Sequence, residues 1–187
     1  EINFSKKFSA LTFEEVLSRF ALINNYQKIP RSDLNIKAKQ FGIDTQDKES
    51  KGKIAEKIFA KICRPKIVQP TFVSYYPLEI LPLAKASETK PGFADMYQLI
   101  VGGLEIAKGF SELNDPLEQR RRFEAGEEMR KAGDEEASRF DQDFLEALEY
   151  GMPPAAGLGI GIDRLVMLFT DSSNIREVIF FPTLRPK

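Results

Sequence analysis

The chain has 187 residues, of which 42 % are hydrophobic and 29 % charged, a length and composition that suit one domain with its own core. Its net charge is −1, so no overall positive field attracts nucleic acid. Histidine is absent and Cys63 is the single cysteine, which excludes histidine triads, histidine metal sites, an internal disulfide and a cysteine-rich zinc site. A reduced, cytoplasmic setting fits, and no segment resembles a membrane span or a signal peptide.

The first third of the chain has the apolar spacing of helices. Thr12 and Glu15 have the spacing of a capping box, and Pro65 ends the last of these helices. The β-branched and aromatic run at 67–75 predicts a strand. The predicted helices are 11–23, 32–41 and 53–62.

A hairpin and further helices follow. Residues 95–101 and 104–113 predict two strands joined by the Gly102-Gly103 turn. Asp115 is expected to cap the next helix, with Glu118 as its capping-box partner. Together these elements predict an α+β fold, an antiparallel sheet flanked by helices. The remaining predicted elements are helices 116–132 and 141–150, a glycine strand from 157, a helix from 162 and a strand at 178–181.

The glycine strand and the helix after it form the most informative run. Gly157, Gly159 and Gly161 alternate with apolar residues, which suits a strand that another group approaches closely. The following helix would present free amides and Arg164 to an anion. A dinucleotide fingerprint would need glycine where Ile162 or Arg164 stands, and no P-loop is present.

The second strand of the hairpin is the other candidate site. Lys108, Phe110 and Glu112 share one face of a regular strand. A carboxylate and an aromatic ring together suit an ammonium group. Periodicity alone leaves open whether this face is an amine pocket or an ordinary exposed strand face.

The run 150–182, with Arg185-Pro186 after it, resembles motif 3 and the C-terminus of class II lysyl-tRNA synthetases. The resemblance implies their antiparallel catalytic sheet, with 1–66 as a helical lead-in and 67–187 as the sheet core. It implies a cytoplasmic enzyme that activates lysine with ATP and Mg²⁺ and transfers it to tRNA(Lys). The full-length protein would be a homodimer.

The resemblance also assigns roles to individual residues. Arg164 would contact the γ-phosphate of ATP, Glu105 would bind magnesium, and Ile106 and Gly161 would contact the nucleotide. Glu112 would receive the ε-ammonium group of lysine. The other expected lysine contacts are Lys108, Phe110 and Gly157.

Two positions depart from the family pattern. Lys108 stands where the family usually has asparagine, and its ammonium would repel a lysine substrate unless it turns away or pairs with an acid. Gln98, a candidate second metal ligand, stands where the family usually has glutamate, so metal affinity should fall. Glu105 and Glu112 would point to opposite faces of a regular strand, so we predict a bulge near 107–109.

Motif 1, motif 2 and the anticodon-binding OB domain are not found, and the chain begins at Glu1, which suggests a fragment or a processed protein. Because motif 2 carries the arginine for the α-phosphate, the chain alone should activate lysine poorly or not at all.

Two alternatives stay open: a ligase that attaches a lysine-like group to a protein, and a non-catalytic nucleotide-binding or dimerisation module. Arg120-Arg121-Arg122 could touch tRNA phosphate, but the acidic residues around it favour a solvated helix face.

Overall fold

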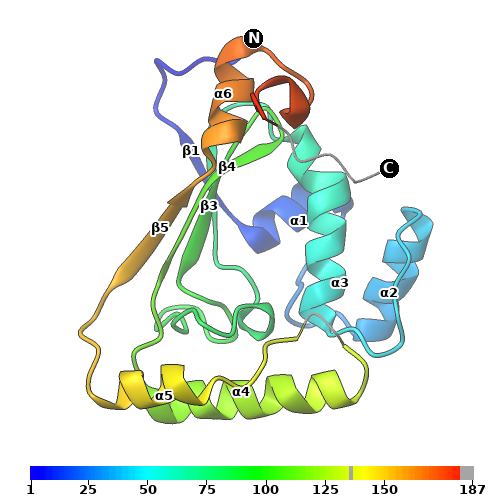
Figure 1. Cartoon of the computed structure of the whole chain (residues 1–187). Helices are drawn as coiled ribbons and strands as arrows, with labels where there is room; N and C mark the ends of the chain where they lie inside the picture. The colour runs from blue at the N-terminus through cyan, green and yellow to red at the C-terminus, as the bar shows by residue number, and fades with distance from the viewer. Residues whose placement is uncertain (135–136, 182–187) are drawn as a thin grey trace, which may run out of the picture.

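The computed structural model describes residues 1–134 and 137–181, which form a five-stranded sheet with helices around it (Figure 1). The strands are β1 (Ser9–Thr12), β2 (Thr71–Ser74), β3 (Met96–Val101), β4 (Leu104–Ser111) and β5 (Ala156–Ile160). The α-helices are α1 (Phe13–Ala21), α2 (Arg31–Gln40), α3 (Lys51–Ile58), α4 (Pro116–Lys131), α5 (Gln142–Glu149) and α6 (Ile162–Thr170).

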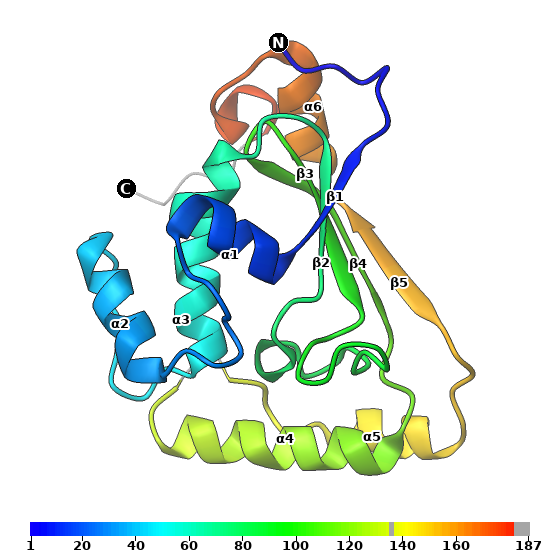
Figure 2. The ribbon, with the colours of Figure 1, turned by 180° about the vertical axis from the view of Figure 1, so that it is seen from behind.

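The strands follow one another in the sheet in chain order, β1-β2-β3-β4-β5. Pairs β2–β3, β3–β4 and β4–β5 are antiparallel, whereas β1 runs parallel to β2. The predicted α+β class is confirmed, and the sheet is mixed although mostly antiparallel. The segment 1–66, expected as a helical lead-in, thus also supplies an edge strand, which Figure 2 shows beside β2. Four residues are too few to reveal a strand by alternation.

Helix α1 starts where its sequence predicts. Thr12 Oγ1 accepts a hydrogen bond from the Glu15 amide at 3.2 Å, and Glu15 Oε2 accepts one from the Thr12 amide at 2.7 Å. This closes the expected capping box, and the backbone hydrogen bond from Thr12 lowers the pKa of Glu15. The helix then begins with Phe13, which is fully buried.

Aromatic rings join the helices to the sheet. The ring centroid of Phe13 lies 5.0 Å from that of Tyr76 and 5.2 Å from that of Phe59. Val73 of β2 and Ile100 of β3 are fully buried in the same cluster. The core therefore lies between α1, the end of α3 and one face of the sheet, and it stabilises that face by removing large apolar surfaces from water.

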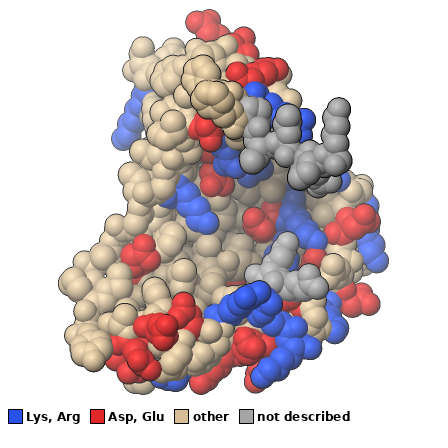
Figure 3. Space-filling model, in the orientation of Figure 1, with Lys and Arg blue, Asp and Glu red and all other residues tan. Residues whose placement is uncertain are grey.

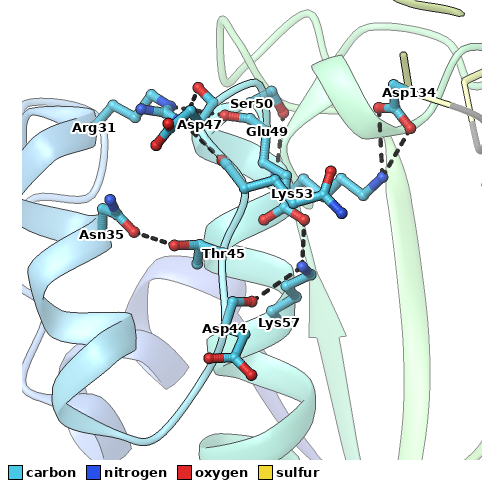
Figure 4. A network of polar contacts seen from close by, with 11 residues as sticks. Arg31, Asn35, Asp44, Thr45, Asp47, Glu49, Ser50, Lys53, Lys57 and Asp134 are labelled. Carbon is cyan, nitrogen blue, oxygen red and sulfur yellow. Dashed lines mark hydrogen bonds and ion pairs between the residues drawn. The ribbon is translucent and has the colours of Figure 1, made fainter.

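A polar network ties α2 to α3 through the loop between them (Figure 4). Arg31 donates to the carbonyls of Glu49 at 2.7 Å and Asp47 at 2.6 Å. Lys57 pairs with the buried carboxylate of Glu49, and Lys53 reaches Asp134 at 3.2 Å. These contacts hold α3 in place along its length, so that its C-terminal end meets the sheet in a defined position.

The end of α3 changes winding as it approaches the sheet. The predicted helix 53–62 is α3 continued by a π-helical turn, η1 (Phe59–Cys63), and a 3₁₀ turn, η2 (Arg64–Lys66). Backbone amides of Gly102 and Gly103 donate to the carbonyls of Val68 and Ile67, both at 2.9 Å. The tip of the β3–β4 hairpin is thereby held against η2, next to Arg64.

Helices α4 and α5 lie side by side across one end of the sheet, and α6 lies at the other end (Figure 1). Phe123 of α4 contacts the ring of Phe144 of α5, with centroids 5.9 Å apart. Asp115 caps α4 as expected, through the Leu117 amide at 2.9 Å. Glu118 Oε1 instead accepts a hydrogen bond from Arg122 Nε at 2.9 Å, so its side chain forms an ion pair within α4 and does not complete a capping box.

The strand predicted at 178–181 does not form. A 3₁₀ turn, η4 (Ile175–Glu177), precedes this segment, and Phe180 and Phe181 are each 94 % exposed. A strand needs a ladder partner, and no described strand lies beside these residues. Within 1–134 and 137–181 no helix is both long and apolar enough to cross a membrane.

Candidate active site

A β-bulge in strand β4 sets which side chains share a face. Leu99 pairs with Ala107 and Ile100 pairs with Glu105, so Ile106 is an extra residue without a partner on β3. The distortion that we predicted at 107–109 is present one residue earlier. Because one residue is inserted, the side chain of Glu105 returns to the face that carries Lys108, Phe110 and Glu112.

Glu105 lies between two arginines from different elements. Arg164 of α6 donates to the Glu105 carbonyl at 2.9 Å, and its guanidinium lies 3.9 Å from Glu105 Oε1. Arg64 of η2 lies 3.9 Å from Glu105 Oε2. Arg164 keeps 46 % of its side chain exposed and Arg64 keeps 32 %, so both can still reach a ligand. This end of the site suits an anion.

Lys108 lies one pair further along the same face. It faces Gln98 directly across β3 and β4, while Gly159 of β5 lies on its other side. The buried Tyr76 hydroxyl donates to Gln98 Oε1 at 2.8 Å. Burial, and then the negative charge of Glu105, raise the pKa of Tyr76, so the phenol stays a neutral donor at neutral pH. Gln98 is therefore oriented by Tyr76.

The other end of this face carries Glu112. Its carboxylate Oε1 occupies the space directly above Gly157, where any side chain would overlap it. Glu112 also lines a cavity of about 400 Å³ together with Tyr75, Lys85 and Asp95. Its carboxylate makes no ion pair with any described residue, so it can receive a cationic group.

The glycines of β5 leave this face of the sheet free of side chains beside β4. Gly157 pairs with Phe110 and Gly159 with Lys108, so both present only backbone beside the candidate site. A Cβ at Gly159 would find its nearest neighbour, the Lys108 carbonyl, at 3.9 Å, so the space above it is open. Gly161 donates to the Ile106 carbonyl at 2.9 Å, which joins the start of α6 to the bulge.

The molecule is hollowed at its centre in Figure 3, between the sheet, α3 and the α4–α5 pair, and basic and acidic side chains gather on the walls. From Glu105 to Glu112 the strand covers about 20 Å at the usual rise per residue. One extended ligand lying along β4 can therefore contact an anion-binding end and a cation-binding end.

A resident magnesium ion fits these residues poorly. Magnesium prefers several oxygen ligands, and Glu105 is the one carboxylate that the described strands place at this end of the face. Its two oxygens already face arginines, and Gln98 is neutral with its oxygen bonded to Tyr76. Among residues 1–134 and 137–181 no three Asp, Glu or Cys side chains converge as a metal site would need.

The residues selected from the sequence thus lie along one face. Arg164, Glu105 and Gly161 meet at one end, Lys108 and Gln98 follow, and Phe110, Glu112 and Gly157 lie at the other. Ile106 is buried, and it contributes its carbonyl to Gly161. The roles of these residues remain predictions. Sequence reasoning missed Arg64 and Tyr76, whose positions depend on how α3 and the 75–76 segment fold back on the sheet.

A largely antiparallel sheet whose glycine strand leads into an arginine-bearing helix is consistent with part of a class II aminoacyl-tRNA synthetase catalytic domain. Comparison with known families agrees: the model for tRNA synthetases class II (D, K and N) matches residues 1–185. The chain belongs to this family.

Its relatives within that family include several lysine–tRNA ligases. The chain is 48 % identical to the lysine–tRNA ligase of Moorella thermoacetica over 177 residues, which are 95 % of this chain and 36 % of that protein. It is 53 % identical to that of Pelotomaculum thermopropionicum over 146 residues, covering 78 % of this chain and 29 % of that protein. The ligase of Shewanella amazonensis matches at 43 % over 100 % of this chain and 39 % of its own length. The matched region thus covers between 29 % and 39 % of the length of these relatives.

Proposed function

We propose that this chain forms the motif 3 part of the catalytic domain of a lysine–tRNA ligase. The whole enzyme would join lysine to ATP, giving lysyl-adenylate and pyrophosphate, and would then transfer the lysyl group to the 3′ end of tRNA(Lys). The lysine carboxylate attacks the α-phosphorus, and the bond from the α-phosphorus to the oxygen bridging to the β-phosphate breaks. That reaction needs alignment and charge neutralisation rather than a general base, which suits a chain without histidine.

One observation carries the proposal: the unpaired carboxylate of Glu112 lies on the same strand face as the Arg164–Glu105–Arg64 cluster. An ammonium group at Glu112 and phosphates at the arginines would place the two reactants end to end along β4. A buried or half-buried carboxylate favours a cationic side chain and repels aspartate, which supports lysine among the D, K and N substrates.

Lysine-dependent exchange of pyrophosphate into ATP tests the proposal. We expect the complete protein that contains this chain to catalyse exchange with lysine and not with aspartate or asparagine. The isolated chain should exchange slowly, because its sequence contains no recognisable motif 2 arginine. Lysine-independent exchange, or a preference for aspartate, would refute the assignment. The tRNA(Lys) partner and a homodimer remain predictions for the complete protein.

A second function, binding of a nucleotide without turnover, is favoured by one observation. Lys108 and Gln98 face each other inside the candidate site and make it more basic than the family pattern. Calorimetry with ATP and lysine on wild type and Glu112→Ala separates the two. The ligase proposal expects lysine to bind and the variant to lose it, whereas a nucleotide-binding module would bind ATP alone.

A further inference from the structure

The proposed nucleotide end of the site has an unusual charge balance. Three cationic side chains, Arg64, Lys108 and Arg164, come from three different elements, and Glu105 is the carboxylate that faces both arginines. The charge of Glu56 also acts on the neighbouring Tyr76. The partners of Lys108 and Glu105 on β3, Gln98 and Ile100, are two residues apart, a separation of about 7 Å along the strand. The Lys108 side chain is therefore long enough to reach the same ligand as the arginines.

We propose, on the basis of the proposed nucleotide site, that this cluster binds the polyphosphate of a nucleoside triphosphate without a divalent metal ion. The ammonium of Lys108 supplies the positive charge that a metal would otherwise bring. Gln98, the partner of Lys108 on strand β3, supplies a neutral oxygen in place of a second carboxylate. Tyr76 holds this oxygen in position through its hydrogen bond.

The surroundings of Lys108 support a role for its ammonium in place of a metal ion. Lys108 makes no hydrogen bond or ion pair with any described residue, so its ammonium is available. The neighbouring position on β5 is Gly159, whose missing side chain leaves open space beside Lys108. A phosphate lying on Gly159 would meet Lys108 on one side and Arg164 towards α6. Charge-assisted hydrogen bonds of this kind are among the stronger ones that proteins make.

The same residues oppose a divalent ion. Lys108 is the register partner of Gln98, so its ammonium would repel a metal bound to Gln98. Both oxygens of Glu105 face guanidinium groups at 3.9 Å. A metal ion would have to displace the arginines from the Glu105 carboxylate. It would then have Glu105 as a single charged ligand. The nucleotide therefore binds here through side-chain cations.

Calorimetric titration of the chain with ATP, once with EDTA and once with excess MgCl₂, tests the inference. We expect the dissociation constant with EDTA to stay within about threefold of that with magnesium, because magnesium has no dedicated ligands here. Lys108→Gln should weaken binding in EDTA roughly tenfold, the usual value of one charge-assisted contact. The double variant Gln98→Glu/Lys108→Asn should bind ATP only when magnesium is present.

Lys28→Gln is the matched control, since Lys28 is an exposed lysine outside the site, and it should bind like wild type. Urea midpoints of all variants check that each is folded. ATP binding that requires magnesium in the wild type would overturn the inference but leave the nucleotide site standing. Equal affinity of wild type and Lys108→Gln in EDTA would also overturn it. Absence of ATP binding in both buffers would refute the nucleotide site and this inference together.

Discussion

The carboxylate of Glu112 occupies the position that a side chain at Gly157 would take. Glu112 directly follows β4 and Gly157 lies on β5, at the end of the sheet opposite Arg164, and the missing side chain of Gly157 makes room for the acid. A glycine that looks like part of a phosphate-binding run therefore serves the proposed amine end of the site.

Gly157→Ala should weaken lysine binding about tenfold, because the new methyl group forces the Glu112 carboxylate to move away from its present position. Leu158→Ala is a suitable control, since Leu158 is 61 % exposed and lies on the opposite face of β5. Calorimetry with lysine measures both. Unchanged affinity in Gly157→Ala would mean that Glu112 does not hold the amine from where it now lies.

Arg164→Gln should lower ATP affinity roughly ten- to a hundredfold, because a hydrogen bond to a charged group contributes about 1.5–3 kcal/mol. The guanidinium is also the group that bridges α6 to the Glu105 carbonyl, so the urea midpoint should be measured in parallel. Arg176→Gln, which removes an exposed arginine of η4, should bind ATP normally. If both variants lost affinity equally, general charge rather than the Arg164 site would explain binding.

Gly109→Ala should destabilise the fold by about 1–3 kcal/mol, the usual cost of overpacking. A Cβ there would come within 2.9 Å of the Tyr97 ring and 3.0 Å of the Gly157 carbonyl. Gly159→Ala, on the same sheet but with open space above it, should cost little or nothing. Urea unfolding compares them, and equal stability of the two variants would contradict the packing argument.

Thr12→Ala should cost about 1 kcal/mol of stability through loss of the α1 capping box. Because the folded pKa of Glu15 is lowered, its contribution is present above its ordinary pKa of 4.5 and is lost as the pH falls through the lowered value. The difference in unfolding free energy between wild type and Thr12→Ala should therefore become smaller at acid pH. Urea unfolding at pH 7 and below pH 4 measures it, and a gap that is constant with pH would argue against the Glu15 half of the box.

Cys63 should stay unreactive in the folded protein. Its thiol is fully buried, and burial raises its pKa from 9.0 to about 11. Between these two values the folded state holds a proton that the unfolded state releases, so stability should fall as pH rises from 9 to 11, by up to about 2 kcal/mol. Burial also raises the pKa of Tyr26 and Tyr76, and both tyrosines add to this loss at the upper end. Cys63→Ala should show a shallower decline, and thiol labelling of the wild type should proceed only on unfolding.

Local signals in the sequence were sufficient for much of the fold. The capping box of α1, the Asp115 cap of α4 and the Gly102-Gly103 turn depend on neighbouring residues, so they can be predicted without the tertiary structure. The prediction of a strand at 178–181 is wrong, because strand formation depends on residues far away in the sequence. The β-branched and aromatic residues of this segment suit a strand, but a strand also needs a partner from elsewhere in the chain.

The sequence by itself determined the class of the fold, the family and the set of residues along the candidate face, because these depend on local spacing and on the identity of side chains. Only the tertiary structure decided that Glu105 and Glu112 share a face, since one unpaired residue, Ile106, reverses the alternation of β4. It also brought Arg64 to Glu105 and set Lys108 opposite Gln98, because hydrogen-bond register and helix docking join residues far apart in the chain.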